Sequence, residues 1–166
     1  MLWPFSPFIP AKEKIKPNPA MNDTQYKYQD NHGSGDRISV VLTNPRLFLY
    51  HCHMQPLEEH ITHGLYGVYI VDPKTPRPPA DEMVMVMNGY DTDFDTENNF
   101  YTVNGIPYYY MHHPIQIEKD RLIRIYLVNI LEFDPINNFH LHANLYQLYR
   151  SGTSLVPHEY TDMVTM

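Results

Sequence analysis

The feature that most constrains the fold is the regular alternation of short β-type runs with turn signals. From residue 37 onward, apolar or alternating runs are broken at Asn44-Pro45, Asp72-Pro73, Asn88-Gly89, Asn104-Gly105 and Lys119-Asp120. Fifteen prolines and fourteen tyrosines fit short strands joined by turns better than long helices. Runs spaced by about 8–12 residues favour an antiparallel sandwich or barrel. The sequence therefore predicts an all-β chain without a helix of three turns.

A proline-rich segment divides this series of strands. Residues 74–82, KTPRPPADE, are predicted to form an extended, stiff linker. Residues 37–73 before it and residues 83–166 after it are predicted to be two β-sandwich units. Residues 1–36 are polar and interrupted by prolines, which is typical of a divergent or disordered arm.

Composition excludes several classes of function. The net charge of -7 argues against nucleic acid as a partner, because phosphate binding requires clustered Lys and Arg. No apolar run approaches the roughly 20 residues that a membrane-spanning helix needs. The first residues lack a basic segment followed by an apolar one, so no signal peptide is predicted. With a single cysteine, the chain cannot form an intrachain disulfide.

That cysteine, Cys52, lies between His51 and His53 in a run that is predicted to be a strand. Since side chains alternate along a strand, Cys52 should point to one face and both histidines to the other. A thiolate on one face and two imidazoles on the other could hold two metal centres joined by a short stretch of backbone. His60, eight residues after the cysteine, and Leu65, five further on, suit a copper site with Cys and His ligands and a weak axial position.

The same residues are open to less specific interpretations. Cys52 could be a small buried apolar residue among ordinary strand histidines. A zinc site is a second alternative, although structural zinc sites usually show paired short spacings of Cys or His. A Cys-His nucleophile is a third, but nothing else in the sequence supplies an acyl-transfer context.

A second group of histidines lies in the segment INNFHLHANLY. His140 and His142 are predicted to share one face of a strand, with Phe139 and Leu141 on the other face. Two imidazoles at positions i and i+2 can bind one metal or two adjacent metals. The occurrence of this pair beside the His-Cys-His segment strengthens a metal interpretation for both.

These segments resemble a known family. YHCHMQPLEEHITHGLYGVYIVDP resembles the last ligand motif of multicopper oxidases, and FHLHAN resembles their first His-x-His motif. VNGIPYYY, EFDPINNFHLHAN and SGTSLVPHEYTDMV extend the likeness to the two-domain branch of small laccases and nitrite-reductase-like proteins. The resemblance covers roughly residues 37–166. It implies cupredoxin-like Greek-key β-sandwiches, with residues 37–73 the C-terminal part of a first domain and residues 83–166 the N-terminal part of a second.

The resemblance also implies roles for individual residues. Cys52 and His60 would bind a mononuclear type 1 blue copper, with Leu65 in the axial place, and the reduction potential would be high because a thioether is missing. His51 and His53 would bind the type 3 part of a trinuclear type 2/type 3 cluster. His142 would join that cluster, and His140 would bind its remaining copper. His51, Cys52 and His53 would thus be the catalytic segment.

The implied activity is laccase-like. One-electron oxidation of a small phenolic, metal-ion or inorganic donor at the blue copper would be coupled to reduction of dioxygen at the cluster. In two-domain relatives the cluster forms between subunits of a homotrimer, and these relatives work outside the cytoplasm. Asn137 stands where a blue-copper histidine would precede the His-x-His motif, so the blue site is predicted in the first unit only.

Several ligands of the family are missing from the sequence. The second histidine of the blue site is not found at the expected distance before Cys52, and His32 is the only histidine upstream of His51. Further His-x-His motifs of both units are also missing. We therefore expect an interior piece of a longer oxidase that is marginally stable alone and binds copper incompletely. A copper nitrite reductase and a non-catalytic copper-binding remnant are the alternative functions; His53, directly after the cysteine, favours the oxidase.

The remaining titratable side chains have less specific interpretations. His63 and His158 are predicted to face solvent, and the pair at 112 and 113 to be turn residues at a strand end. Glu132 and Asp134 would either orient an imidazole and relay protons or be solvated turn carboxylates.

Overall fold

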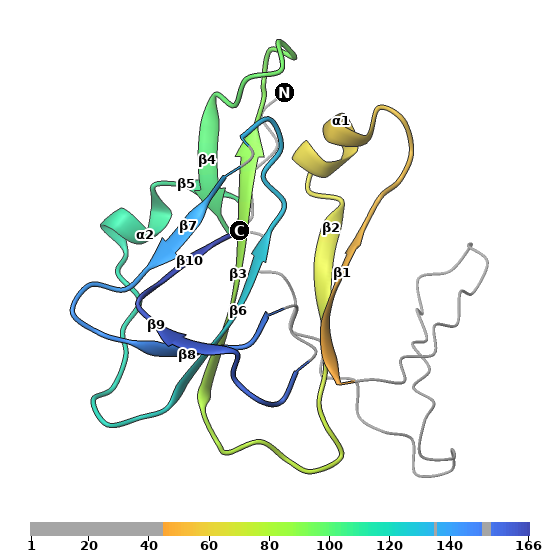
Figure 1. Cartoon of the computed structure of the whole chain (residues 1–166). Helices are drawn as coiled ribbons and strands as arrows, with labels where there is room; N and C mark the ends of the chain where they lie inside the picture. The colour runs from red at the N-terminus through yellow and green to blue at the C-terminus, as the bar shows by residue number, and fades with distance from the viewer. Residues whose placement is uncertain (1–44, 135, 151–153) are drawn as a thin grey trace.

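The computed structural model describes residues 45–134, 136–150 and 154–166 (Figure 1). The predicted arm at residues 1–36 and the strand run before residue 45 lie outside the described residues. Within them, the chain forms ten strands and two short helices, so the prediction of a mainly β chain without a long helix is confirmed. None of the helices in the described part is long and apolar enough to cross a membrane.

The first strands form an antiparallel hairpin that carries a helix in its connection. Strand β1 (Arg46–His51) pairs with β2 (Tyr66–Val71), with His51 opposite Tyr66, and α1 (Leu57–Thr62) lies between them. Acidic residues occupy the first turn of α1 and a histidine its last turn, an order that the helix dipole favours. The segment after Cys52 is therefore partly helical.

A four-stranded sheet follows the proline-rich segment. It contains β3 (Asp81–Tyr90), β4 (Phe100–Val103), β5 (Ile106–Pro107) and β6 (Ile123–Asn129) in the order β5-β4-β3-β6. The β3–β4 and β4–β5 pairs are antiparallel, as expected, but β3 and β6 are parallel. The chain between β3 and β6 includes β4, β5 and α2 (Tyr109–His112), which is long enough for the crossover that a parallel pair requires.

The last strands form two small antiparallel pairs. Strand β7 (Asn138–His140) pairs with β10 (Met163–Thr165), and β8 (Tyr146–Leu148) pairs with β9 (Glu159–Thr161). Figure 1 shows β7 and β10 on the far side of β3 from β1 and β2.

The two faces of β3 explain this arrangement. Val86 is fully buried in a cluster with Tyr66 and Val68 of β2. The next residue, Met87, must point to the opposite face, where its sulfur lies 3.6 Å from the amide nitrogen of Asn137 at the entry to β7. The β1–β2 hairpin and the β7–β10 pair therefore cover opposite faces of the central sheet.

The Asn88-Gly89 dipeptide is not the turn that the sequence predicts. Both residues lie inside β3, where Asn88 is 1% exposed. Gly89 is opposite Tyr101 on β4, and a Cβ added to it would overlap the carboxamide of Asn98. Glycine is needed here because the Asn98 side chain packs directly against the strand. A glycine inside a strand often marks such a close approach rather than a turn. The turn predicted at Asn104-Gly105 is confirmed, with φ of 57° and 84°.

We expect Gly89→Ala to destabilise the fold by about 1–3 kcal/mol, the usual cost of overpacking a filled site. The Asn98 carboxamide would have to move, although it donates 2.8 Å to Asp134 Oδ2. Denaturant unfolding measures the change. On an Asn98→Ala background the same substitution should cost less, because the clash is gone. An equal cost on both backgrounds would contradict the packing explanation.

Candidate copper centres

The cysteine and the first predicted ligand histidine lie together at the connected end of the β1–β2 hairpin. Cys52 follows the last residue of β1, and its main-chain N–H donates to the Leu65 carbonyl at 2.8 Å. Helix α1 brings His60 back over this end, so that Cys52 Sγ lies 3.6 Å from His60 Nδ1. The structure thus brings together a half-buried thiol and the Nδ1 atom of an imidazole, as the sequence predicts for a blue copper site.

Leu65 is tied to this site through its backbone. Its carbonyl accepts the Cys52 N–H, while the residue as a whole is 50% exposed. The axial role predicted for the Leu65 side chain stays a prediction.

His51 and His53 form a separate pair. Their ring centroids are 5.9 Å apart at an interplanar angle of 60°, and both residues are exposed. Although β1 ends at His51, the alternation of side chains continues, since Cys52 contacts His60 while the two histidines approach each other. His51 Nδ1 lies 2.8 Å from the Cys52 carbonyl oxygen. A carbonyl only accepts, so Nδ1 carries the proton and Nε2 is left for a metal.

His140 and His142 form a second imidazole pair, with ring centroids 4.8 Å apart. Only His140 is part of β7, and the single long strand that the sequence predicts is interrupted after it. The chain turns at Ala143, whose φ is 57°, and then enters β8. The pair is therefore brought together at a strand end rather than along one strand face.

The two imidazole pairs belong to opposite sides of the molecule. His51 ends β1 and His140 ends β7, and these strands cover opposite faces of the central sheet (Figure 1). Among the described residues, the only three His, Cys, Asp or Glu side chains whose ligand atoms converge are Asp91, Asp93 and Asp95. The predicted copper residues thus meet as three pairs, each of which needs further ligands.

In the acidic group, Asp91 has a structural role in the β3–β4 loop. Asp91 accepts main-chain N–H groups of Phe94 at 2.6 Å and Thr96 at 2.8 Å, and so shapes the β3–β4 loop. Asp93 and Asp95 are exposed beside it.

Asp134 has a structural role that neither sequence interpretation included. Its Oδ2 accepts hydrogen bonds from Asn98 at 2.8 Å and from the Tyr101 hydroxyl at 2.7 Å, which together lower the pKa of the carboxyl. It thereby fixes the segment before β7 to the β3–β4 loop. Burial, and then the charge of Glu58, raise the pKa of Glu132.

Most of the remaining histidines make hydrogen bonds or ring contacts with residues close to them in the sequence. His63 is exposed, as predicted, and its Nδ1 lies 2.6 Å from the Glu59 carbonyl. His112 ends α2, and His113 stacks on Tyr109 at 4.5 Å, so this pair ends a helix rather than the predicted strand. His158 is exposed, as predicted, and its Nδ1 accepts the Arg150 N–H at 3.2 Å.

One residue near the predicted ligands was missed by the sequence. Asp162, directly before β10, accepts a contact from His140 Nδ1 at 2.9 Å through its main-chain carbonyl. It lies in a segment that carries the family likeness, but its contact with His140 depends on the register in which β10 pairs with β7.

The strand arrangement is that of a cupredoxin-like β fold, and the thiol-imidazole contact and the imidazole pairs are groups that could bind a metal. The donor set fits copper, since soft thiolate and imidazole ligands are those that copper prefers. Residues 12–75 match the family model described as multicopper oxidase. A solved multicopper oxidase is 50% identical with a TM-score of 0.71, over 78% of this chain and 47% of that chain.

Other relatives are nitrite reductases. The copper-containing nitrite reductase of Neisseria meningitidis is 34% identical over 65 residues, which are 39% of this chain and 16% of that protein. The copper nitrite reductase of Nitrosomonas europaea shares the fold at a TM-score of 0.64 and 23% identity, over 84% of this chain and 58% of that chain. The chain thus spans less than half the length of the multicopper oxidase and a small part of the Neisseria protein.

Sequence and fold together identify the chain as a relative of the multicopper oxidases. The predicted family resemblance, the cupredoxin-like β fold and copper as the metal are confirmed.

Proposed function

We propose that the protein is a copper-dependent oxidoreductase of the laccase-like multicopper oxidase type. It would oxidise a small donor one electron at a time and reduce dioxygen to water. The observation that carries this proposal is the segment from His51 to His53. It presents a thiol to His60 at 3.6 Å and, in the other direction, two imidazoles whose ring centroids are 5.9 Å apart.

Cys52 and His60 would hold the blue copper. A copper there supplies one-electron redox chemistry at a thiolate ligand. The half-buried environment of Cys52 limits access of water to the thiolate. The Cys52 N–H donates to the Leu65 carbonyl, which fixes the cysteine backbone. Leu65 itself would offer the copper no thioether.

His51 and His53 would hold part of the trinuclear cluster. They are the direct backbone neighbours of Cys52, so the covalent path between the two centres is short. The remaining part would be held by His140 and His142. Since these pairs lie at ends of strands on opposite faces of the sheet, we propose that a second copy of the chain completes each cluster. A homotrimer with heterologous contacts provides this arrangement.

The second candidate function is reduction of nitrite at copper. The Neisseria relatives favour it, because their match covers 65 residues at 34% identity. His53 favours the oxidase, because a nitrite reductase does not need a histidine directly after the cysteine.

We expect the copper-loaded chain to consume dioxygen with a reduced donor in proportion to the copper that it binds. His53→Ala should abolish this consumption and preserve the absorption of copper at Cys52, because it removes only a cluster ligand. An oxygen electrode measures the dioxygen consumption, and visible spectra measure the absorption of copper at Cys52. The copper bound per chain is determined in the same samples. His63→Ala is the matched control and should change neither reading.

Two other outcomes of this experiment would contradict the oxidase proposal. Donor oxidation that requires nitrite and survives His53→Ala would support the second candidate. Bound copper without either activity would support a non-catalytic remnant.

A further inference from the structure

We propose that Asp162 is the positioning residue of His140, acting through both its main-chain carbonyl and its side-chain carboxylate. The inference rests on the proposed copper site at His140 and His142. It concerns how that site is held in the metal-free chain, and it adds a residue that the ligand motifs do not contain.

The first part of the argument is the pairing of two distant segments. His140 is opposite Met163 in the β7–β10 ladder, so the residue before Met163 lies next to the point where β7 ends. The Asp162 carbonyl there accepts the Leu141 N–H at 2.8 Å. The same oxygen lies 2.9 Å from His140 Nδ1. One carbonyl therefore fixes both the backbone beyond the strand and the imidazole.

The second part is the tautomer that this contact requires. Because a carbonyl oxygen cannot donate, His140 Nδ1 must carry the hydrogen and Nε2 must carry the lone pair. A neutral imidazole with a free Nε2 is the form that binds a metal. His51 is held in the same way by the Cys52 carbonyl at 2.8 Å. The partner of His51 is its own neighbour, whereas the partner of His140 is 22 residues away.

The third part is the carboxylate. Its Oδ2 is 3.9 Å from His140 Nδ1, which is too long for a hydrogen bond and short enough for an electrostatic attraction. The side chain is about half exposed (54%), so water weakens this attraction. A negative charge near the Nδ1 hydrogen makes Nε2 a stronger donor to metal.

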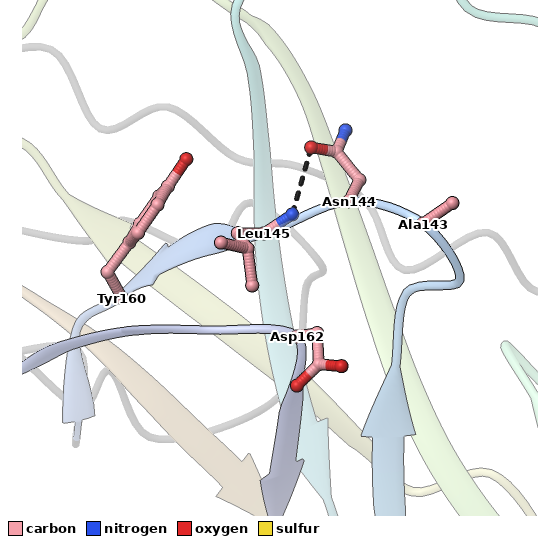
Figure 2. A pocket seen from close by; sticks show the side chains of 5 residues that line it. All are labelled: Ala143, Asn144, Leu145, Tyr160 and Asp162. Atoms are coloured by element: carbon pink, nitrogen blue, oxygen red, sulfur yellow. Dashed lines mark hydrogen bonds between the residues drawn. The ribbon is translucent and has the colours of Figure 1, made fainter.

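The Asp162 side chain lies next to a turn and lines a pocket. Figure 2 shows Asp162 beneath the turn formed by Ala143, Asn144 and Leu145, which line a pocket of about 380 Å³ with Asp162 and Tyr160. Asn144 Oδ1 accepts the Leu145 N–H at 2.9 Å and thus stabilises the turn itself. The carboxylate thus lines this pocket and is about half exposed, so solvent can reach it.

The test uses the full chain and copper(II) alone. In the metal-free chain, long-range proton–nitrogen spectra should show His140 with its hydrogen on Nδ1. Copper affinity at this residue is then read from the broadening of the His140 resonances during titration. Asp162→Asn should lower that affinity about tenfold, the lower end of the range for groups that orient metal ligands. The tautomer should persist, because the main-chain carbonyl remains.

Glu118→Gln is the matched control, because it removes one exposed carboxylate that pairs with Arg121 elsewhere on the surface. It should leave the affinity at His140 unchanged. Equal affinities of the unsubstituted and Asp162→Asn chains, or a hydrogen on Nε2 of His140 in the unsubstituted chain, would overturn the inference. Copper that does not broaden His140 in the unsubstituted chain would instead contradict the proposed copper site.

Discussion

His60→Ala should remove the thiolate-to-copper absorption of the chain at copper concentrations that saturate the unsubstituted protein. His60 Nδ1 is 3.6 Å from Cys52 Sγ at the connected end of the hairpin, and the two side chains are the proposed ligands of the blue copper. Changes in groups that only orient ligands cost about 10–100-fold in metal affinity. Loss of a ligand itself should therefore cost at least about 100-fold. Titration with copper(II), followed by visible absorption, gives the affinity.

His63→Ala is the matched control for this substitution. His63 is the C-cap of the same helix, but its Nδ1 is bound to the Glu59 carbonyl at 2.6 Å and the residue is exposed. Its loss should leave the absorption unchanged. Cys52→Ser should abolish the absorption completely, because the sulfur is its source. Retention of the band in His60→Ala, or its loss in His63→Ala, would show that copper at Cys52 uses other ligands.

Sequence patterns predicted the parts of the structure that depend on local geometry. The alternation of side chains around Cys52 correctly separated the thiol from the two flanking imidazoles, even though β1 ends at His51. His60, eight residues after Cys52, was predicted to share a metal site with the cysteine, and the structure brings the two side chains to 3.6 Å. Turn chemistry correctly predicted the reversal at Asn104-Gly105.

The parts that could not be predicted depend on contacts between distant segments. Asn88-Gly89 has the composition of a turn, but the packing of Asn98 against Gly89 keeps it within β3. The parallel pairing of β3 and β6 depends on the crossover between them. Asp162 reaches His140 only through the β7–β10 register. In each case the local sequence is compatible with more than one structure, and tertiary packing selects one.

Mixing two defective variants should restore copper binding if the cluster is shared between copies. His53→Ala lacks a ligand at the end of the hairpin, and His142→Ala lacks one beyond β7, on the opposite face of the sheet. In an assembly of both variants, a hairpin end from His142→Ala can meet a β7 end from His53→Ala, and this cluster has all its histidines. With random mixing, about a quarter of the contacts are of this kind, because each contact joins two different surfaces.

We therefore expect co-expressed His53→Ala and His142→Ala chains to retain about a quarter of the cluster copper of the unsubstituted protein. Each variant expressed alone should retain less cluster copper than the mixture does. The measurement is copper per chain after dialysis, with the Cys52 absorption subtracted as the blue-site share. A mixture of His51→Ala and His53→Ala is the matched control, because both lack the same half and no contact can be complete. Failure of the first mixture would contradict a cluster built from two copies and would require all four histidines to act within one chain. Restoration in the control mixture would contradict the assignment of both His51 and His53 to the cluster.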